Sequence, residues 1–321
     1  MKRYISVLSM ICMFSFAGIV GATAQEAQTA NPASDFEYDL TKDGEGVIIK
    51  KYTGKATDVV IPAVIEDFPV VEIGNKAFTE THIVSIVFPD SATINDGYYE
   101  DKYSDYGYGY GCCSSCNSLV KVILPKKLKK IPEVMFYGCT SLKEITLPTE
   151  IQEIGYMAFR DSGLESIVIP DSIEEIKYMT FRGCTQLQTV VIGSRVKTVN
   201  AGAFYKCKAL KTITLPNAVK IIGGAAFYQS GLESIALPDS VETISGGAFA
   251  DCKELKTVSI GKGIKLITDA AFENCSSLKN ITIKAEKVNY GYYSDKIFSG
   301  CSSLSLKDKK KLKDTGYTGV F

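Results

Sequence analysis

Phenylalanine recurs along much of the chain at an interval of 22 or 23 residues. The recurring residues are Phe136, Phe159, Phe181, Phe204, Phe227, Phe249 and Phe272. Similarity at a fixed period of about 20 to 50 residues is the sequence signature of stacked repeats, in which each unit packs only on its neighbours. The chain is therefore predicted to be a repeat protein.

Several other positions recur in phase with the phenylalanine. One unit reads, with x at the variable positions, Cys139-x-x-Leu142-x-x-Ile145-x-Leu147-Pro148-x-x-Ile151-x-x-Ile154-x-x-x-Ala158-Phe159. The alternation around Ile145 and Leu147 predicts a short strand with one buried face, which the proline ends because it has no amide hydrogen to donate. The pattern predicts ten rungs, with strand ends at Pro62, Pro89, Pro125, Pro148, Pro170, Gly193, Pro216, Pro238, Gly261 and Lys284.

This unit resembles the BspA-like leucine-rich repeats of bacterial surface proteins, and the resemblance runs from about Ala56 to Leu304. It implies a repeat solenoid, a right-handed superhelix with a concave parallel β-sheet and an irregular or short-helical convex side. About ten rungs of 22–23 residues would stack in it. The resemblance also implies an exported protein with a role in adhesion or host interaction. No binding residue is constant across that family, so none is transferred to this chain.

The two ends of the chain differ from the repeat. Residues 1–24 combine a basic start, an apolar run and the Ala22-Thr23-Ala24 pattern, which together predict a cleaved signal peptide. Residues 25–55 are expected to form a linker and a β-hairpin cap, residues 56–304 the solenoid, and residues 305–321 a C-terminal cap. We expect an extracellular or cell-surface protein without stable membrane insertion, with the periplasm left open.

A Tyr- and Gly-rich insertion at about 90–113 interrupts the period, because Phe78 and Phe136 are 58 residues apart. Its tyrosines offer large amphipathic contact area, and its glycines let a loop adapt to a partner. We expect residues 97–111 to be the principal contact loop; the alternatives are a disordered spacer and packing over the N-terminal rungs. The candidate ligand-binding residues are Tyr98, Tyr99, Tyr103, Tyr106, Tyr108 and Tyr110.

Two glycines mark turns that are one residue short, Gly163 and Gly231. A tighter connection is expected to need a positive φ there, which glycine adopts without strain.

The outward-facing positions of the predicted strands form a second candidate site. One column is mildly apolar in the N-terminal half of the chain, and its candidate residues are Val60, Val87, Ile123, Val168 and Val191. The column fits a concave strip that binds an extended protein or glycan. It equally fits ordinary β-propensity on a solvated sheet.

Seven cysteines share one repeat position, where Ser162, Ser230 and Thr81 replace them in other turns. This interchange predicts a buried position for a small side chain, with the thiols mainly reduced. Cys112 and Cys113 lie outside this column, and either could close the insertion through a disulfide. The Cys113-x-x-Cys116 spacing resembles half of a zinc or redox site, but no second pair accompanies it, so no metal site is predicted.

Composition argues against several classes of function. The 36 basic and 36 acidic residues balance, which disfavours nucleic acid as a partner. His82 is the one histidine, which excludes most His-dependent catalysis. Carboxylate neighbours such as Glu174 and Glu175 are better explained as solvated surface residues than as an acid–base pair. We therefore expect no enzyme activity, no catalytic residues and no cofactor.

The sequence thus predicts an exported, non-enzymatic binding protein. Its repeat surface and its Tyr/Gly-rich loop would recognise a protein or glycan partner in adhesion or host interaction. The alternative is a structural protein of the cell envelope that has no host ligand.

Overall fold

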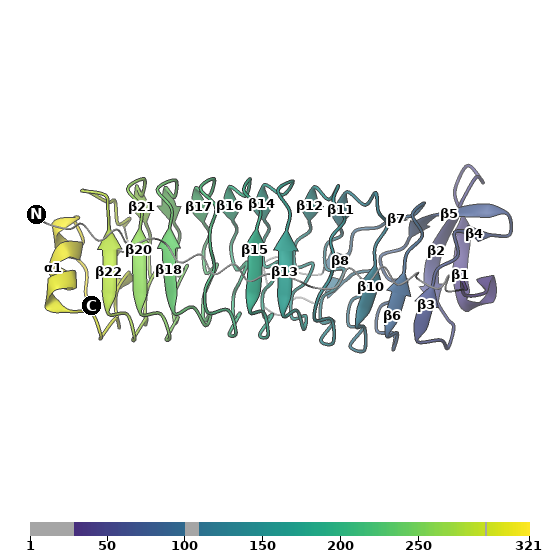
Figure 1. Cartoon of the computed structure of the whole chain (residues 1–321), viewed down its shortest axis with the longest axis horizontal. Helices are drawn as coiled ribbons and strands as arrows, with labels where there is room; N and C mark the ends of the chain where they lie inside the picture. Colours follow the sequence, from purple (N-terminus) through teal and green to yellow (C-terminus); the bar gives the residue numbers. More distant parts are fainter. Residues whose placement is uncertain (1–28, 100–108, 293) are drawn as a thin grey trace, which may run out of the picture.

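The computed structural model describes residues 29–99, 109–292 and 294–321, which stack turn upon turn into an elongated rod (Figure 1). The predicted signal peptide, residues 1–24, lies outside the described residues. Within the described ranges, no helix combines the length and apolar character needed to cross a membrane.

One side of the rod, here called the front face, carries the strands predicted from the Ile-x-Leu alternation. Neighbouring strands are parallel and in register, as in the pairing of Ser166 with Thr189. This confirms the predicted solenoid with a parallel sheet. The front strands are β3 (Asp58–Val60), β6 (Ser85–Val87), β10 (Lys121–Ile123), β13 (Ser166–Ile169), β15 (Thr189–Ile192), β18 (Ser234–Leu237), β20 (Thr257–Ile260) and β22 (Asn280–Ile283).

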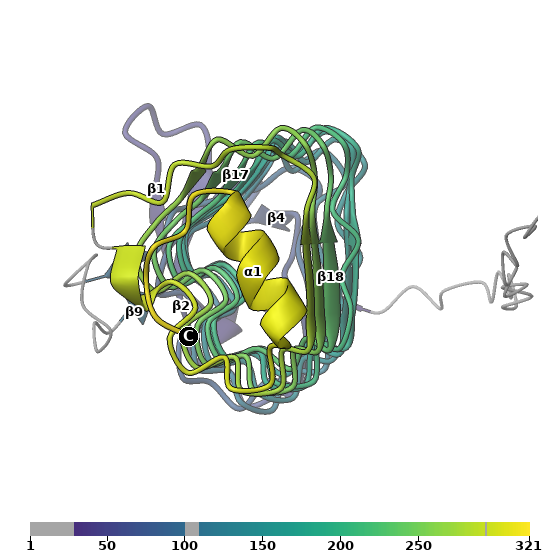
Figure 2. The same ribbon diagram turned by 90° about the vertical axis from the view of Figure 1, so that its left-hand side faces the viewer.

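A second row of short strands, which the sequence did not indicate, lies on the back of the rod. These strands contain the recurring Ile of the second half of the unit, or Val199 in one turn, and this side chain points inward, as Ile176 and Ile222 do. Figure 2 shows β17 and β18 on different sides of the stack. The row consists of β5 (Phe68–Ile73), β7 (Thr93–Ile94), β11 (Lys130–Ile131), β12 (Glu153–Ile154), β14 (Glu175–Ile176), β16 (Thr198–Val199), β17 (Ile221–Ile222), β19 (Thr243–Ile244) and β21 (Leu266–Ile267).

The third side of the rod, here called the turn face, runs from three residues before each recurring Phe to two residues after it. Its backbone is hydrogen-bonded from turn to turn, as where Phe204 N–H donates to Ala226 O at 2.7 Å. Residues two before and two after the Phe adopt positive φ in most turns, for example Met179 at 53° and Lys206 at 59°. The change between positive and negative φ along the turn face orients backbone N–H and C=O groups parallel to the rod axis. Successive turns can therefore form hydrogen bonds with each other.

The phenylalanines themselves form a continuous stack inside the turn face. From Phe136 to Phe298 the neighbouring ring centroids are 5.1 to 5.7 Å apart and nearly parallel. Each of these rings is fully buried. Tyr52 stacks on Phe78 at one end, and Tyr317 packs edge-on against Phe298 at the other, so aromatic residues cover both ends of the core.

The N-terminal residues cover the first rung. A short 3-10 helix, η1 (Ala33–Asp35), leads into the antiparallel pair β1 (Phe36–Leu40) and β2 (Val47–Tyr52). β2 continues the back row by parallel pairing with β5, and β4 (Val64–Ile65) forms a hairpin with β5. Asn31 satisfies the outer edge of β3, because its N–H donates to Val60 O and its Oδ1 accepts from Val60 N–H.

The C-terminal residues cover the last rung. After η2 (Ser294–Lys296), the helix α1 (Leu306–Asp314) lies across the end of the stack in contact with β22 (Figure 2). Ser305 caps the helix by accepting a hydrogen bond from Asp308 N–H. Leu312 and Tyr317 are buried against the final turn.

The cysteine column has a specific bonding role. Each thiol donates to a carbonyl in the preceding turn, as Cys184 does to Phe159 O at 3.0 Å and Cys207 to Phe181 O at 3.2 Å. Where serine replaces cysteine, its hydroxyl remains in contact with the next thiol, with Ser162 Oγ 3.4 Å from Cys184 Sγ. A small side chain with a weak donor therefore suits this position. The nine described cysteines are all buried and free.

We expect the seven thiols of this column to resist alkylation in the native protein and to react fully once it is unfolded. Burial raises the pKa of Cys184 to about 12 and that of Cys252 to about 11, so little thiolate exists at neutral pH. Iodoacetamide labelling before and after addition of denaturant, read by mass spectrometry, measures this difference. Rapid labelling of all seven thiols before denaturation would contradict the buried column.

The short turns owe their glycines to close packing, and the predicted need for a positive φ is wrong. Gly163 and Gly231 are absent from the residues with positive φ. A Cβ on Gly163 would instead lie 2.0 Å from Thr140 O, and one on Gly231 would lie 2.0 Å from Lys208 O. The shortened connection brings the chain against the backbone of the preceding turn, which leaves no room for a side chain.

Candidate functional site

The candidate strip of apolar residues lies on the front face, but its members differ in exposure. Val168 and Val191, on the paired strands β13 and β15, are 61% and 52% exposed. Val60, Val87 and Ile123 are half-buried. Val168 and Val191 are therefore the most accessible apolar residues of this front-face column.

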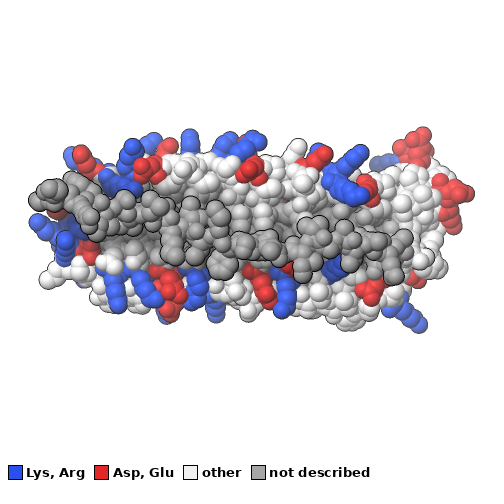
Figure 3. All heavy atoms as spheres, viewed as in Figure 1, with Lys and Arg blue, Asp and Glu red and all other residues white. Residues whose placement is uncertain are grey.

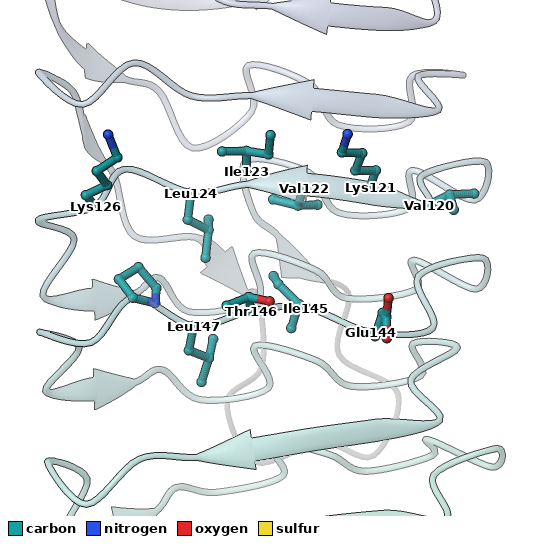
Figure 4. Close-up of a pocket in the computed structure, with 11 residues that line it drawn as sticks. Val120, Lys121, Val122, Ile123, Leu124, Lys126, Glu144, Ile145, Thr146 and Leu147 are labelled. Carbon is teal, nitrogen blue, oxygen red and sulfur yellow. The ribbon is translucent and has the colours of Figure 1, made fainter. Parts of the chain in front are cut away.

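The front row is interrupted beside this pair. Residues 144–147 occupy the position of a front strand, yet no backbone hydrogen bond joins these described residues to a neighbouring turn. A cavity of about 420 Å³ opens here between β10 and residues 144–148. Figure 4 shows β10 as a strand and the segment of Glu144 to Leu147 without one, with Val122 and Ile145 among the lining side chains.

A second interruption occurs at residues 212–215, where the described backbone again bonds to neither neighbouring turn. A cavity of about 710 Å³ lies beside it, lined by Thr214, Ala236 and Ser259 among others. Both openings leave backbone N–H and C=O groups of the front face without a protein partner. Such groups are what an extended polypeptide uses when it adds to a sheet.

Charged residues of both signs line the long edges of the front face (Figure 3). They pair between turns, as Lys143 does with Glu165 and Lys256 with Glu233. Exposed pairs of this kind contribute little to stability. Their mixed signs leave no single-sign field along these edges.

The Tyr/Gly-rich insertion leaves the rod between the back row and the turn face. Its two ends pair as β8 (Tyr98–Tyr99) and β9 (Gly109–Tyr110), and Figure 2 shows β9 on the outside of the stack, away from β18. Of the candidate tyrosines, Tyr103, Tyr106 and Tyr108 lie outside the described residues. Tyr110 is half-buried, with the Lys76 ammonium 4.3 Å from its ring centroid.

The base of the insertion is attached to the next turn. Asp96 accepts hydrogen bonds from Lys130 Nζ at 2.8 Å and from Glu133 N–H at 3.2 Å. Gly97 N–H donates to Glu133 O, and a Cβ on Gly97 would lie 2.2 Å from that same oxygen. Asp96 and Gly97 therefore anchor the insertion at a defined point.

Cys112 and Cys113 occupy the Ala and Phe positions of a complete repeat turn. Phe78 N–H donates to Cys112 O as Phe136 N–H does to Ala158 O. The interpretation of these cysteines as the end of the insertion is therefore corrected: both are fully buried in the core. Cys113 carries no ring, so it interrupts the aromatic stack in the turn that bears the insertion.

The carboxylates considered as an acid–base pair are engaged with neighbouring turns, Glu174 in ion pairs and Glu175 in a hydrogen bond. Glu174 accepts from Lys197 at 2.8 Å and from Arg195 at 2.6 Å, and these hydrogen bonds lower the pKa of its carboxyl. Glu175 accepts from Asn200. These contacts make the two side chains part of the row of polar interactions that joins neighbouring turns.

The turn face carries a surface that sequence reasoning missed, here called the tyrosine–arginine strip. Its residues lie one position after the recurring Phe or three positions before it, and Tyr110 borders them. The strip consists of Tyr110, Tyr137, Tyr156, Arg160, Tyr178, Arg182, Tyr205 and Tyr228. Aligning the columns beside the Phe would have revealed it, because tyrosine or arginine fills the following position in five consecutive turns, 137 to 228.

The strip packs over a small apolar cluster of the turn face. Val134, Met157 and Met179 are buried together, with Tyr137 and Tyr178 packed against them. Arg160 and Arg182 are also largely buried, each with a guanidinium nitrogen near the methionine sulfur three residues earlier. The Tyr rings are half-buried, so part of each remains at the surface.

Comparison with solved structures finds other bacterial repeat proteins. A leucine-rich repeat protein from Bacteroides ovatus ATCC 8483 is 22% identical, with a TM-score of 0.59 over 84% of this chain and 80% of its own. A leucine rich repeat protein of T. pallidum is 28% identical, with a TM-score of 0.46 over 91% and 99% of the two chains. A leucine rich cell surface protein from Faecalibacterium prausnitzii A2-165 is 20% identical, with a TM-score of 0.37 over 92% and 100%.

No curated protein matches the chain. The family described as the BspA type leucine rich repeat region matches residues 108–232 and 220–316, with six copies. These matches cover more than half of the chain, and they coincide with turns whose strands, aromatic stack and thiol column repeat in the structure. The chain therefore belongs to the BspA type leucine rich repeat family.

Proposed function

We propose that this protein is exported and acts as a non-enzymatic binding protein that recognises a protein or glycan partner. The observation that carries the proposal is the insertion. It interrupts one turn at its surface, while Cys112 and Cys113 continue that turn's core and its backbone ladder. A segment that lies outside the repeat core, and that is rich in tyrosine and glycine, suits contact with another molecule.

Other features support the same function. The signal-peptide pattern of residues 1–24 supports export, and the family supports an adhesion or host-interaction role by resemblance. The front face adds Val168, Val191 and the opening at residues 144–147 as a second place for contact. Cleavage of the protein by added protease on intact cells would favour a surface-exposed binding protein over an internal component of the envelope.

Replacing residues 98–110 by a short Gly-Ser linker is expected to lower partner binding at least tenfold, or about 1.4 kcal/mol. The thermal midpoint should hardly change, because loops of this length add little closure entropy and the linker retains Asp96, Gly97 and Gly111. The partner is first captured with the mature protein from host and envelope extracts, and its affinity is then measured for both proteins.

A variant of unchanged length, in which serine replaces the six tyrosines of the insertion, separates the side chains from the loop itself. It should lose as much affinity as the linker variant. Unchanged affinity in both variants would contradict a binding role of the insertion and would direct attention to the front face.

A further inference from the structure

The charge of the chain is distributed unevenly along the rod. Residues 29–80, which form the N-terminal cap and the first turn, contain ten acidic and five basic residues. Residues 279–321, which form the last turn and the C-terminal cap, contain four acidic and nine basic residues. Residues 81–278 between them are nearly balanced, with 21 acidic and 20 basic residues. The two ends of the rod therefore carry opposite net charge.

At the N-terminal end, acidic side chains accompany exposed apolar residues. Glu37 and Asp39 lie on β1 and Glu45 in the loop that follows it, and all three are exposed. Leu40 on β1 and Val64 on β4 are 51% and 55% exposed. Among the described residues β1 pairs with β2 alone, so its outer edge has no strand partner. Figure 1 shows β1 and β4 at this end, and Figure 3 shows acidic side chains projecting from it.

At the C-terminal end, α1 lies across the stack and presents lysines together with a leucine (Figure 2). Leu306 is 87% exposed, and Lys307, Lys310 and Lys313 are exposed as well. Leu306, Lys310 and Lys313 follow the i, i+4, i+7 spacing and so share one helix face, opposite the buried Leu312. Within the described part of the chain, these three lysines take part in no ion pair. Their charge is therefore available to another molecule.

A second copy of the chain is the one partner that suits both ends. Opposite charges attract in a head-to-tail arrangement, and like ends repel each other. Figure 2 shows that successive turns superpose along the rod, so a second rod placed end to end continues the same axis. Such a contact covers the exposed apolar residues of both ends and places a helix over the open edge of β1, a common way to protect a sheet edge. A polyanion would suit the basic end alone.

We propose that the C-terminal end of one copy docks on the N-terminal end of the next, with α1 against β1 and β4. The two surfaces differ, so the contact is heterologous and each pair of copies keeps one free acidic end and one free basic end. The assembly therefore grows as an open linear chain instead of closing as a dimer. This assembly goes beyond the binding function proposed above and does not depend on it.

Sedimentation velocity of the mature chain, residues 25–321, over a range of concentrations tests the contact. At low ionic strength we expect the weight-average mass to rise steadily with concentration and to pass about twice the mass of one chain. In about 0.5 M salt it should return to that of one chain, because exposed charges are then screened. A mass that stays at one chain at low salt, or that stops at a dimer, contradicts the proposal.

Two charge-reversal variants test the ends separately, each replacing three exposed residues that belong to no ion pair of the described chain. They are Glu37→Lys/Glu45→Lys/Glu66→Lys for the acidic end and Lys307→Glu/Lys310→Glu/Lys313→Glu for the basic end. Each variant alone should sediment as one chain at low salt, because both of its ends then carry charge of the same sign. An equimolar mixture should associate again, because it retains the wild-type pairing of a basic C-terminal end with an acidic N-terminal end.

The matched control is Lys127→Glu/Lys208→Glu/Lys253→Glu, which changes the net charge as the basic-end variant does but away from both ends. These lysines are exposed and belong to no ion pair among the described residues. The control should match the wild-type mass at each concentration. Thermal melts establish that all variants are folded, and Lys310→Glu alone replaces the basic-end variant if that one unfolds.

Three further outcomes would overturn the proposal. One is a loss of association in the control equal to that in the end variants. Another is a mixture of the two folded end variants that forms no complex, although the wild-type contact is present in it. The third is a chain that remains single but cosediments with phosphatidylglycerol vesicles through the lysines of α1, which would assign the basic end to an anionic membrane surface.

Discussion

Replacing Phe204 by Ala is expected to lower the free energy of unfolding by about 3 to 5 kcal/mol. The Phe204 ring is fully buried between those of Phe181 and Phe227, whose centroids are 5.4 and 5.3 Å away. Alanine leaves a cavity in the stack, because the backbone ladder of the turn face keeps the neighbouring turns at their spacing. The loss therefore includes both the transfer of the ring to water and the contacts of the two rings beside it.

Urea denaturation followed by circular dichroism measures this loss. Val191→Ala is the control, because Val191 is 52% exposed on the front face and its truncation should change the stability by less than about 0.5 kcal/mol. A loss below about 1 kcal/mol for Phe204→Ala would mean that the phenylalanine column does not support the stack.

Gly231→Ala is expected to destabilise the protein by about 1 to 3 kcal/mol, although it adds one methyl group. The new Cβ would lie 2.0 Å from Lys208 O and 2.9 Å from Lys208 C. Both atoms belong to the backbone of the preceding turn, so neither can rotate away as a flexible side chain would. Relief requires the two turns to separate, which strains the hydrogen bond from Gly231 N–H to Cys207 O.

Gly44→Ala is the comparison variant, because it tests the cost of an unfavourable backbone conformation without the steric crowding that is expected at Gly231. Gly44 has a φ of 74° in the loop between β1 and β2, and a Cβ there meets no atom within 4 Å. Its substitution should cost about 1 to 2 kcal/mol through the left-handed backbone alone. The same urea titrations apply to both variants. A Gly231→Ala protein as stable as the wild type would show that the short turns tolerate a side chain.

The surfaces available to a partner were predictable only in part. The outward columns of the strands follow from the two-residue period, so the sequence alone places Val168 and Val191 on an exposed face. The tyrosine–arginine strip does not follow from that two-residue period, although an alignment of the positions beside the recurring Phe would reveal its residues. Tyr156 and Arg160 lie in different sequence columns, and they lie on one surface only because the tight turn around Phe159 brings both columns to the same side.

For the insertion too, the sequence predicted one property correctly and another incorrectly. Its composition indicated exposure, but its length was misjudged, because the next turn carries Cys113 where other turns carry Phe. Cys113 is fully buried at that place, and three residues later the column thiol Cys116 donates to Phe78 O, as the other column thiols do to the turn before them. The two cysteines are assigned to the core by the hydrogen-bond ladder, which joins residues far apart in the sequence.

The sequence by itself determined the period, the number of turns, the buried columns and eight of the ten predicted front strands; residues 144–147 and 212–215 form no strand, and the back row was not predicted. Each correct prediction follows from a local rule, in which one apolar position in every turn must face the core and a proline or glycine ends the strand. Only the tertiary structure decided what depends on contacts between turns. Contacts between residues about 23 positions apart decide the partners of the thiols, the crowding at Gly163 and Gly231, the openings in the front row and the tyrosine–arginine strip. The sequence pattern within one turn does not specify these contacts.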